Sequence, residues 1–439
     1  MRKIRKKRGL LGILMIAALL GTGCNREQAN PQLYVDHGIR ETPVTVFTEN
    51  AEVSAAIEER CKAVLNQDES TNITVYSDSA NYYAEDGLSY RELLLKRLAS
   101  GNADDLYMIH AEDVLEFDEK GYIYDMSALE FTGNLSHDAL TQSTYNGKVF
   151  SIPLSYTGFG FIWNVDMLKQ YGLKLPENLE EFLNVCETLK ENGILPYGAN
   201  KDYALTVPVM CVGLHDIYQS DDCNEKLEAL SNGTAAISEY MEKGFDFLQM
   251  MIDKGYMNPD RALETLPKKE EEKSFFANGN CAFICAIYSG KALEGYPFEI
   301  AMTPLPVLEN GSVCVVGADQ RMAINPRSKH LDSAIAIVEA LGQAETLDTF
   351  AKNQGRISSS KNATAPDIPQ TDSLIACIAE GRQIPNQDFS LNFNVWENVR
   401  DLSQQLCRGE ECSPGGSRIR FHTDGGDFKI RELTIKNAG

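Results

Sequence analysis

Positive charge is scarce in this chain. Of its 439 residues, 41 are lysine or arginine and 63 are aspartate or glutamate, so the formal net charge is −22. Six basic residues fall within the first 23 positions, which leaves 35 in the remainder and a net charge there near −28. Proteins bind nucleic acids through patches of basic residues, and they bind anionic bilayers through clusters of basic residues. The composition therefore argues against both kinds of partner.

The sequence also lacks the short motifs of common catalytic and metal sites. It contains no HExxH, GxSxG, CxxC or phosphate-binding P-loop motif. No pair of acidic residues stands at a spacing that indicates a glycosidase. We therefore expect a protein that is not an enzyme and that holds neither a metal nor a cofactor.

The apolar stretch near the N-terminus is too short to span a bilayer. Six of the seven residues at 2–8 are basic, and residues 9–20 form an apolar run of 12, the length of a signal-peptide core. Small residues precede Cys24, so this end resembles a lipobox, at which cleavage leaves a lipid-modified cysteine. We expect residues 1–23 to be a lipoprotein signal peptide and residues 24–40 a tether. The alternative is an ordinary secretory signal that is cleaved nearby.

Eleven cysteines are many for an exported protein. Cys281 and Cys285 lie four residues apart in an apolar run, where an extended strand holds them more than roughly 10 Å apart, beyond disulfide reach. We interpret the ten cysteines other than Cys24 as small buried thiols. Cys407 and Cys412 are close enough in sequence to close a small loop.

Strands and helices alternate in the first quarter of the chain. Apolar patterns predict strands at 43–48, 72–76 and 104–109, with helices at 51–67 and 90–100 between them. Consecutive strands joined by helices pair in parallel through right-handed crossovers. This pattern predicts an α/β fold.

Residues 145–203 carry the clearest turn and helix signals. A hairpin turn at Asn146-Gly147 precedes two apolar runs, 149–153 and 159–163, that we expect to be separate strands. Asn178 is placed to cap an amphipathic helix that ends at Gly193. Later patterns predict helices at 235–254, 331–341 and 394–407 and strands at 281–287, 298–306 and 313–325.

Five elements of this stretch occur in a distinctive order. They are Gly147-Lys148, Pro153, Trp163-Asn164 with Asp166, the segment 172–182 and the segment 190–196. Together with the run LASGNADDLYMI at 98–109, they resemble the family 1 solute-binding proteins of ABC importers, the maltodextrin-binding type. The resemblance covers residues 41 to about 412.

The resemblance implies a periplasmic-binding-protein-like fold, in which a hinge joins two α/β lobes and the ligand cleft lies between them. We expect residues 41–144 and 300–350 to form lobe 1, and residues 145–299 and 351–412 to form lobe 2. The tail, 413–439, does not fit the family and alternates in part as a strand would. It is either the start of a further domain or a disordered end.

The resemblance and the element ends also indicate candidate ligand contacts. Sugar sites combine aromatic faces with planar polar groups, and clefts in α/β folds lie beyond the carboxyl ends of strands. For each candidate, the alternative is a role in packing or on the surface, and we interpret Trp163 as a core residue. The candidates are His110, Glu112, Asp113, Tyr156, Asp202, Tyr203, Tyr288, Asp319, Arg321 and Trp396.

These features predict a lipid-anchored monomer on the outer face of the cytoplasmic membrane. It would capture a small polar solute, by resemblance a mono- or oligosaccharide, through hinge closure and deliver it to the transmembrane subunits of an ABC permease. One alternative is a surface module that presents the solute to a signalling partner or begins a longer surface protein. Another is a polysaccharide-binding scaffold.

Overall fold

The structure is a computed structural model. It describes residues 43–49, 51–64, 74–79, 88–267, 270–363, 367–391, 393–409, 421–424 and 427–430. The expected signal peptide, Cys24, the tether and Cys412 lie outside the described residues. In the part of the chain that is described, no helix has the length and apolar character of a membrane span.

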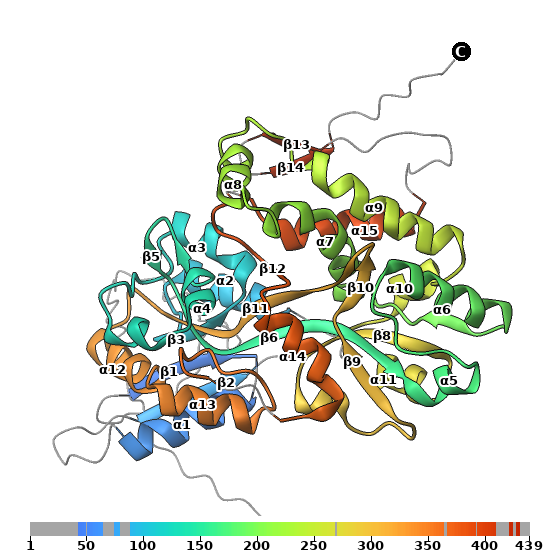
Figure 1. The fold of residues 1–439 in the computed structure, drawn as a ribbon. Helices are drawn as coiled ribbons and strands as arrows, with labels where there is room; N and C mark the ends of the chain where they lie inside the picture. Colours follow the sequence, from blue (N-terminus) through green and yellow to red (C-terminus); the bar gives the residue numbers. More distant parts are fainter. Residues whose placement is uncertain are drawn as a thin grey trace, which may run out of the picture.

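Within these residues, ten strands form one mixed sheet (Figure 1). The main strand order of the sheet is β2 (Thr74–Ser79), β1 (Pro43–Thr48), β3 (Leu106–Ile109), β11 (Gly311–Ile324), β6 (Ile152–Asn164), β8 (Cys281–Ile287) and β7 (Leu195–Tyr197). Outside this order, β9 (Ile300–Thr303) pairs with β6, and β10 (Leu305–Leu308) and β12 (Gln383–Pro385) pair with β11. The first three strands pair in parallel, as the alternation of strands and helices predicts.

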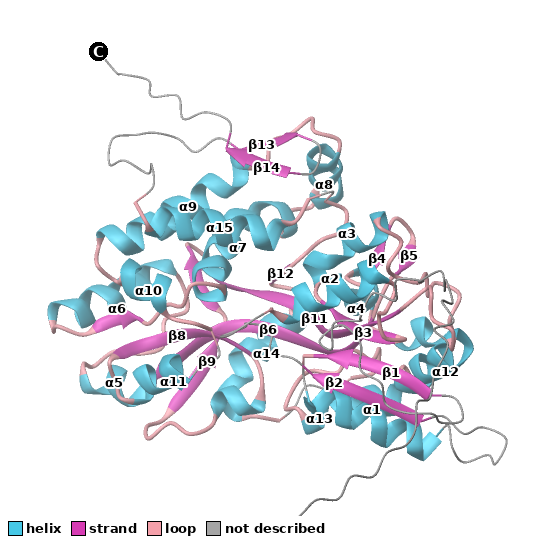
Figure 2. Cartoon of the chain, turned by 180° about the vertical axis from the view of Figure 1, so that it is seen from behind, coloured by secondary structure: helices cyan, strands magenta, loops and turns pink. Residues whose placement is uncertain are grey.

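Strands β6 and β11 connect the two halves of the molecule. They pair antiparallel with each other, and β11 continues along β3 while β6 continues along β8 and β9. Figure 1 shows β6 running from the half that contains β1 and β2 to the half that contains β8 and β9, and Figure 2 shows the same arrangement from behind. These two strands therefore cross from one half to the other.

The sequence prediction of two strands, 149–153 and 159–163, is wrong. A short strand, β5 (Lys148–Val149), is followed by the single 13-residue strand β6, which is buried throughout. Polar Ser155 and Thr157 do not interrupt it, because each finds a hydrogen-bond partner far along the chain. The Ser155 hydroxyl bonds to Gln320 at 3.1 Å, and Thr157 donates to the carbonyl of Tyr288 at 3.0 Å.

Helices cover the sheet at both ends (Figures 1 and 2). The half with β1–β3 contains α1 (Ala51–Val64), α2 (Tyr90–Ser100), η1 (Ala111–Asp113), α3 (Val114–Glu119), η2 (Glu130–Asn134), α4 (His137–Thr141), α12 (Leu331–Leu341) and α13 (Ala344–Asn353). The other half contains α5 (Val165–Gln170), α6 (Leu179–Glu191), α7 (Tyr203–Tyr218), α8 (Cys223–Ser231), α9 (Ser238–Asp253), α10 (Pro259–Glu264), α11 (Glu270–Ala277), η3 (Gly290–Leu293) and α15 (Val395–Cys407). η4 (Pro369–Thr371) and α14 (Asp372–Ala379) pack against β9, and α14 also packs against β6 and β11.

Local capping determines where α6 begins and ends. The side chain of Asn178 accepts a hydrogen bond from the backbone N–H of Glu181 at 3.0 Å, which confirms the expected N-cap. The Glu181 carboxylate accepts from the N–H of Glu177 instead of from the cap residue, so the capping box is not reciprocal. Gly193 has a φ of 76°, a left-handed conformation that suits glycine and stops the helix.

An aromatic cluster forms the core beneath α6 and α9. Trp163 is fully buried and packs 4.3 Å from Phe283, ring centroid to ring centroid, and its indole N–H donates to the Thr303 hydroxyl at 2.9 Å. Phe182 on α6 packs against both Phe283 and Phe247. Trp163 is therefore a core residue, and a partner satisfies its one polar atom.

Two short hairpins lie outside the main sheet. β4 (Thr144–Tyr145) pairs with β5, and Asn146 and Gly147 between them have φ values of 50° and 73°, which confirms the expected hairpin turn. In the tail, β13 (Phe421–Asp424) pairs with β14 (Asp427–Ile430), and the other residues of 413–439 lie outside the described part. The lobe boundaries drawn from the resemblance stay a prediction.

Candidate ligand cavity

A cavity of about 910 Å³ lies between the two halves. Its walls come from the ends of β1 and β3 on one side, from the start of α7, the end of β8 and α15 on the other, and from β6 and β11 at the crossing. Six of the ten candidate residues line it: His110, Glu112, Asp202, Tyr203, Asp319 and Trp396. Residues that are up to 286 positions apart in the chain are thus brought to one cavity.

Three aromatic rings form one wall of the cavity. The Phe159 ring lies 5.3 Å from that of Trp396 and 5.7 Å from that of Tyr203, centroid to centroid, with tilts of 38° and 41°. Trp396 is half-buried, and its indole N–H donates to an Asp202 carboxylate oxygen at 3.3 Å. The wall therefore combines an apolar surface with a carboxylate at its edge.

The start of α15 holds Trp396 in place. Asn394 caps this helix by accepting a hydrogen bond from the N–H of Glu397 at 3.2 Å. Val395, Val399 and Leu402 form its buried face, and Trp396 lies about 100° further round, beside that face. The helix therefore packs through its aliphatic face and presents the indole toward the cavity.

The start of α7 holds Asp202 and Tyr203. The Asn200 side chain accepts hydrogen bonds from the N–H groups of Asp202 and Ala204, at 3.0 and 3.2 Å. The Tyr203 hydroxyl donates to Glu272 on α11 at 3.1 Å. Both candidates are buried, and hydrogen bonds with neighbouring residues fix their positions.

His110 and Glu49 lie on the opposite side of the cavity from Asp202 and Tyr203. Nε2 of His110 lies 2.8 Å from Oε1 of Glu49, and both residues line the cavity. Burial lowers the pKa of His110, but the nearby carboxylates of Glu49, Glu112 and Asp113 raise it more, to about 10. His110 is therefore a cation at neutral pH, and this wall carries a paired charge.

The crossing strand β11 contributes Asp319 and Gln320 to the cavity. Asp319 forms an ion pair with Arg356, which follows α13 and also lines the cavity. Gln320 has a φ of 51°, in the left-handed region, although it is not glycine. Its side-chain oxygen bonds to Ser155 on β6, so its amide connects the two crossing strands inside the cavity.

Four candidates do not line this cavity. Asp113 is 1% exposed, and its carboxylate accepts from Arg91 Nε at 2.6 Å and from the N–H of His110 at 2.9 Å. The Tyr156 hydroxyl accepts from the amide of Gln142 at 3.3 Å. Tyr288 is fully buried, and Arg321 is buried with its guanidinium donating to the Gln142 carbonyl. Burial lowers the pKa of Arg321 to about 10, so it remains a cation in the core.

Several cavity residues carry little signal in the sequence. The sequence indicates only that Phe159 belongs to a buried strand, yet its ring packs against Trp396 and Tyr203. Gln320 lies between two candidates but has no signal of its own, and neither Glu272 nor Arg356 has one. The alternation of Phe159 with Phe161 indicates that the two rings share one face of the strand, and that Phe159 is the nearer of the two to the point where β6 and β11 cross.

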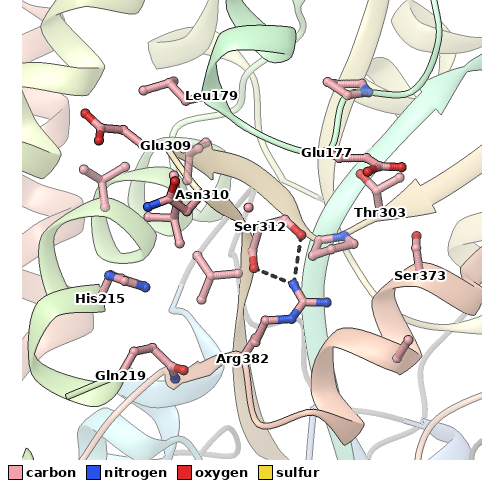
Figure 3. A pocket seen from close by; sticks show the side chains of 18 of the residues that line it. Glu177, Leu179, His215, Gln219, Thr303, Glu309, Asn310, Ser312, Ser373 and Arg382 are labelled. Atoms are coloured by element: carbon pink, nitrogen blue, oxygen red, sulfur yellow. Dashed lines mark hydrogen bonds between the residues drawn. The ribbon is translucent and has the colours of Figure 1, made fainter. Parts of the chain in front are cut away.

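A second, separate cavity of about 990 Å³ lies beside the turn between β10 and β11 (Figure 3). None of the ten candidates lines it. No group of three or more His, Cys, Asp or Glu side chains that could hold a metal occurs among the described residues. The cavity between the halves is therefore the one that the candidate residues define.

A cavity closed from two sides by α/β halves, with an aromatic wall and two crossing strands, defines a solute receptor. Residues 86–376 match the family described as bacterial extracellular solute-binding protein, and the chain belongs to this family. The fold prediction is confirmed.

The chain is also similar to individual proteins over most of its length. The multiple sugar-binding protein of Streptococcus mutans is 23% identical over 363 residues, which is 79% of this chain and 80% of that protein. A family 1 extracellular solute-binding protein from Bifidobacterium longum subsp. infantis superposes with a TM-score of 0.64 at 18% identity, over 84% of this chain and 95% of that one. The structure of RafE in complex with raffinose gives 0.63 at 17% identity, over 84% and 96%.

Proposed function

We propose that this chain captures a mono- or oligosaccharide in the cavity between its halves and delivers it to an ABC permease. The observation that carries the proposal is the wall of Phe159, Tyr203 and Trp396 with Asp202 at its edge. A pyranose ring has an apolar face that packs on an aromatic ring and hydroxyls that bond to carboxylates. The relatives named for sugar binding and the raffinose complex support the same class of ligand.

The roles of the cavity residues follow from their positions. Trp396, Tyr203 and Phe159 supply the stacking surface. Asp202, Glu112 and Asp319 accept hydrogen bonds from ligand hydroxyls, and His110 donates. Because these groups come from both halves, a ligand that contacts all of them binds the closed form better than the open form. Its binding therefore shifts the equilibrium toward closure about β6 and β11.

The surroundings of the receptor are part of the same proposal. Lipid on Cys24 would hold the chain, as a monomer, at the outer face of the cytoplasmic membrane, within reach of the transmembrane subunits of the permease. The family is extracellular, which agrees with this location. Its members are solute-binding proteins, and we infer that this chain likewise binds without catalysis.

Tryptophan fluorescence tests the proposal, because the chain has only two tryptophans. The variant Trp163→Phe leaves Trp396 as the sole reporter, and Trp396→Phe leaves the core residue Trp163. Titration with raffinose, stachyose and xylo-oligosaccharides should shift the emission of the Trp163→Phe protein. It should leave that of the Trp396→Phe protein unchanged. If no carbohydrate changes the emission of Trp396 in a folded protein, the proposed wall is not the binding surface.

A further inference from the structure

Two cysteines adjoin, in sequence, residues that line the second cavity. Its wall includes Ser312 on β11, Ala376 on α14 and Arg382 just before β12. Figure 3 shows Arg382 reaching across to Ser312, to which its guanidinium donates two hydrogen bonds, 2.7 Å to the carbonyl and 3.0 Å to the hydroxyl. Cys377 follows Ala376 on α14, and Cys314 lies two residues after Ser312 on β11.

The two thiols converge on one atom. Sγ of Cys314 lies 3.7 Å and Sγ of Cys377 lies 3.1 Å from the main-chain oxygen of Arg382. Both sulfurs therefore contact the same main-chain oxygen. Both are free thiols, and both side chains are fully buried. The fold therefore brings two cysteines to one carbonyl oxygen although 62 residues separate them in the chain.

The environment makes the two thiols chemically unequal. Interaction with the Cys314 thiol and the nearby Arg382 guanidinium lowers the pKa of Cys377 against the opposing effect of burial. The same interaction, together with burial, raises the pKa of Cys314. Burial raises the pKa of Cys186 and Cys211, so these lack the acidic character of Cys377. Cys377 is thus the more acidic thiol of the two, and the thiolate is the reactive form of cysteine.

We propose that Cys314 and Cys377 are a redox pair that closes into an intramolecular disulfide when hydrogen peroxide enters the second cavity. The Cys377 thiolate attacks one peroxide oxygen, the O–O bond breaks, and the leaving hydroxide takes up a proton to become water. Cys377 is then a sulfenic acid. The Cys314 sulfur attacks the Cys377 sulfur, the S–O bond breaks, and a second water leaves with the thiol proton. The peroxide has accepted two electrons, and the two thiols have lost them.

The position of the pair gives the crosslink a structural consequence. From Cys314 the chain runs along β11 to α12 and α13 in the other half, and it returns to α14, which carries Cys377. A disulfide would tie the outgoing and returning connections together at one end. Closing so long a loop restricts the unfolded chain, so oxidation should raise the thermal midpoint by several degrees. This property does not depend on which solute the receptor binds.

Peptide mapping tests the pair directly. The purified chain is treated with hydrogen peroxide, blocked with N-ethylmaleimide in denaturant and digested without reduction. Mass spectrometry should find a peptide that joins Cys314 to Cys377 with the loss of two hydrogens, while Cys186 is recovered as a blocked thiol. Dithiothreitol should remove both the crosslink and the rise in thermal midpoint. Recovery of both cysteines as blocked thiols from a folded protein after peroxide treatment would overturn the proposal, and so would a link to Cys211.

Variants assign the two roles. Cys314→Ser should stop the reaction at a sulfenic acid on Cys377 that dimedone traps, whereas Cys377→Ser should leave Cys314 a thiol at the same peroxide dose. Cys186→Ser, another buried cysteine, is the matched control and should form the crosslink at the wild-type rate. Arg382→Gln should slow crosslinking several-fold near neutral pH, and Arg382→Lys should slow it less. Crosslinking at the wild-type rate in both Arg382 variants would show that Arg382 does not activate Cys377.

Discussion

Replacing Trp396 with alanine separates ligand stacking from core packing. The indole lies 5.3 Å from Phe159 and donates to Asp202, but it is only half-buried at the cavity wall. Its removal therefore widens the cavity and leaves no sealed void. Stacking of a planar base on an aromatic side chain contributes about 1–3 kcal/mol, and we take the same range for a sugar face. Trp396→Ala should therefore weaken carbohydrate binding by roughly 5- to 150-fold.

Calorimetric titration measures this loss, and Trp163 supplies the control. Trp163 is fully buried and hydrogen-bonded to Thr303, so Trp163→Ala should lower the free energy of unfolding by about 3–5 kcal/mol. Trp396→Ala should leave the ligand-free thermal midpoint close to that of the wild type. Unchanged affinity in a well-folded Trp396→Ala protein would refute the stacking role. A stability loss as large as that of Trp163→Ala would make Trp396 a core residue.

Three further predictions concern other parts of the chain. The folded-state pKa of His110, near 10, lies above its unfolded value of about 6.5, so its pairing with Glu49 stabilises the fold fully below about pH 6.5 and is lost as pH rises toward 10. The free energy of unfolding of His110→Gln, measured by denaturation, should not show this part of the pH dependence. A pH profile identical to that of the wild type would contradict the prediction. Gly160→Ala should lower stability by about 1–3 kcal/mol, because the added methyl would collide with the Thr303 carbonyl, whereas a neutral change in chemical denaturation would show that β9 can shift. Mass spectrometry of membranes should find lipid on Cys24 and none in Cys24→Ser, and a mature chain beginning elsewhere would exclude the anchor.

Local chemistry explains which parts of the fold could be predicted. The caps Asn178 and Asn394 satisfy backbone N–H groups within their own first helical turn, so sequence alone locates both helix starts. The single long β6 could not be predicted in the same way. Ser155 and Thr157 look like a break between two strands, and only Gln320 and Tyr288, which are more than 100 residues away, make their burial possible.

The residues of the candidate site likewise divide into those that sequence could predict and those that it could not. His110, Asp202 and Trp396 stand at the ends of elements, and such ends meet at the cleft of an α/β fold whatever the details of packing. Tyr156 and Arg321 lie inside central strands that are buried on both faces, so sequence alternation does not show which side faces the cavity. Arg356 follows a helix in a loop, and only the folded chain brings it to Asp319.

Thermal denaturation across a panel of neutral mono- and oligosaccharides, with amino acids and short peptides for comparison, tests the central claim most directly. A ligand that binds only the folded state raises the thermal midpoint with concentration, by mass action. The account predicts that at least one carbohydrate raises it in this way and that the rise shrinks in Trp396→Ala. A chain stabilised by an amino acid or peptide and by no carbohydrate, or one whose carbohydrate response is the same in Trp396→Ala, would contradict it.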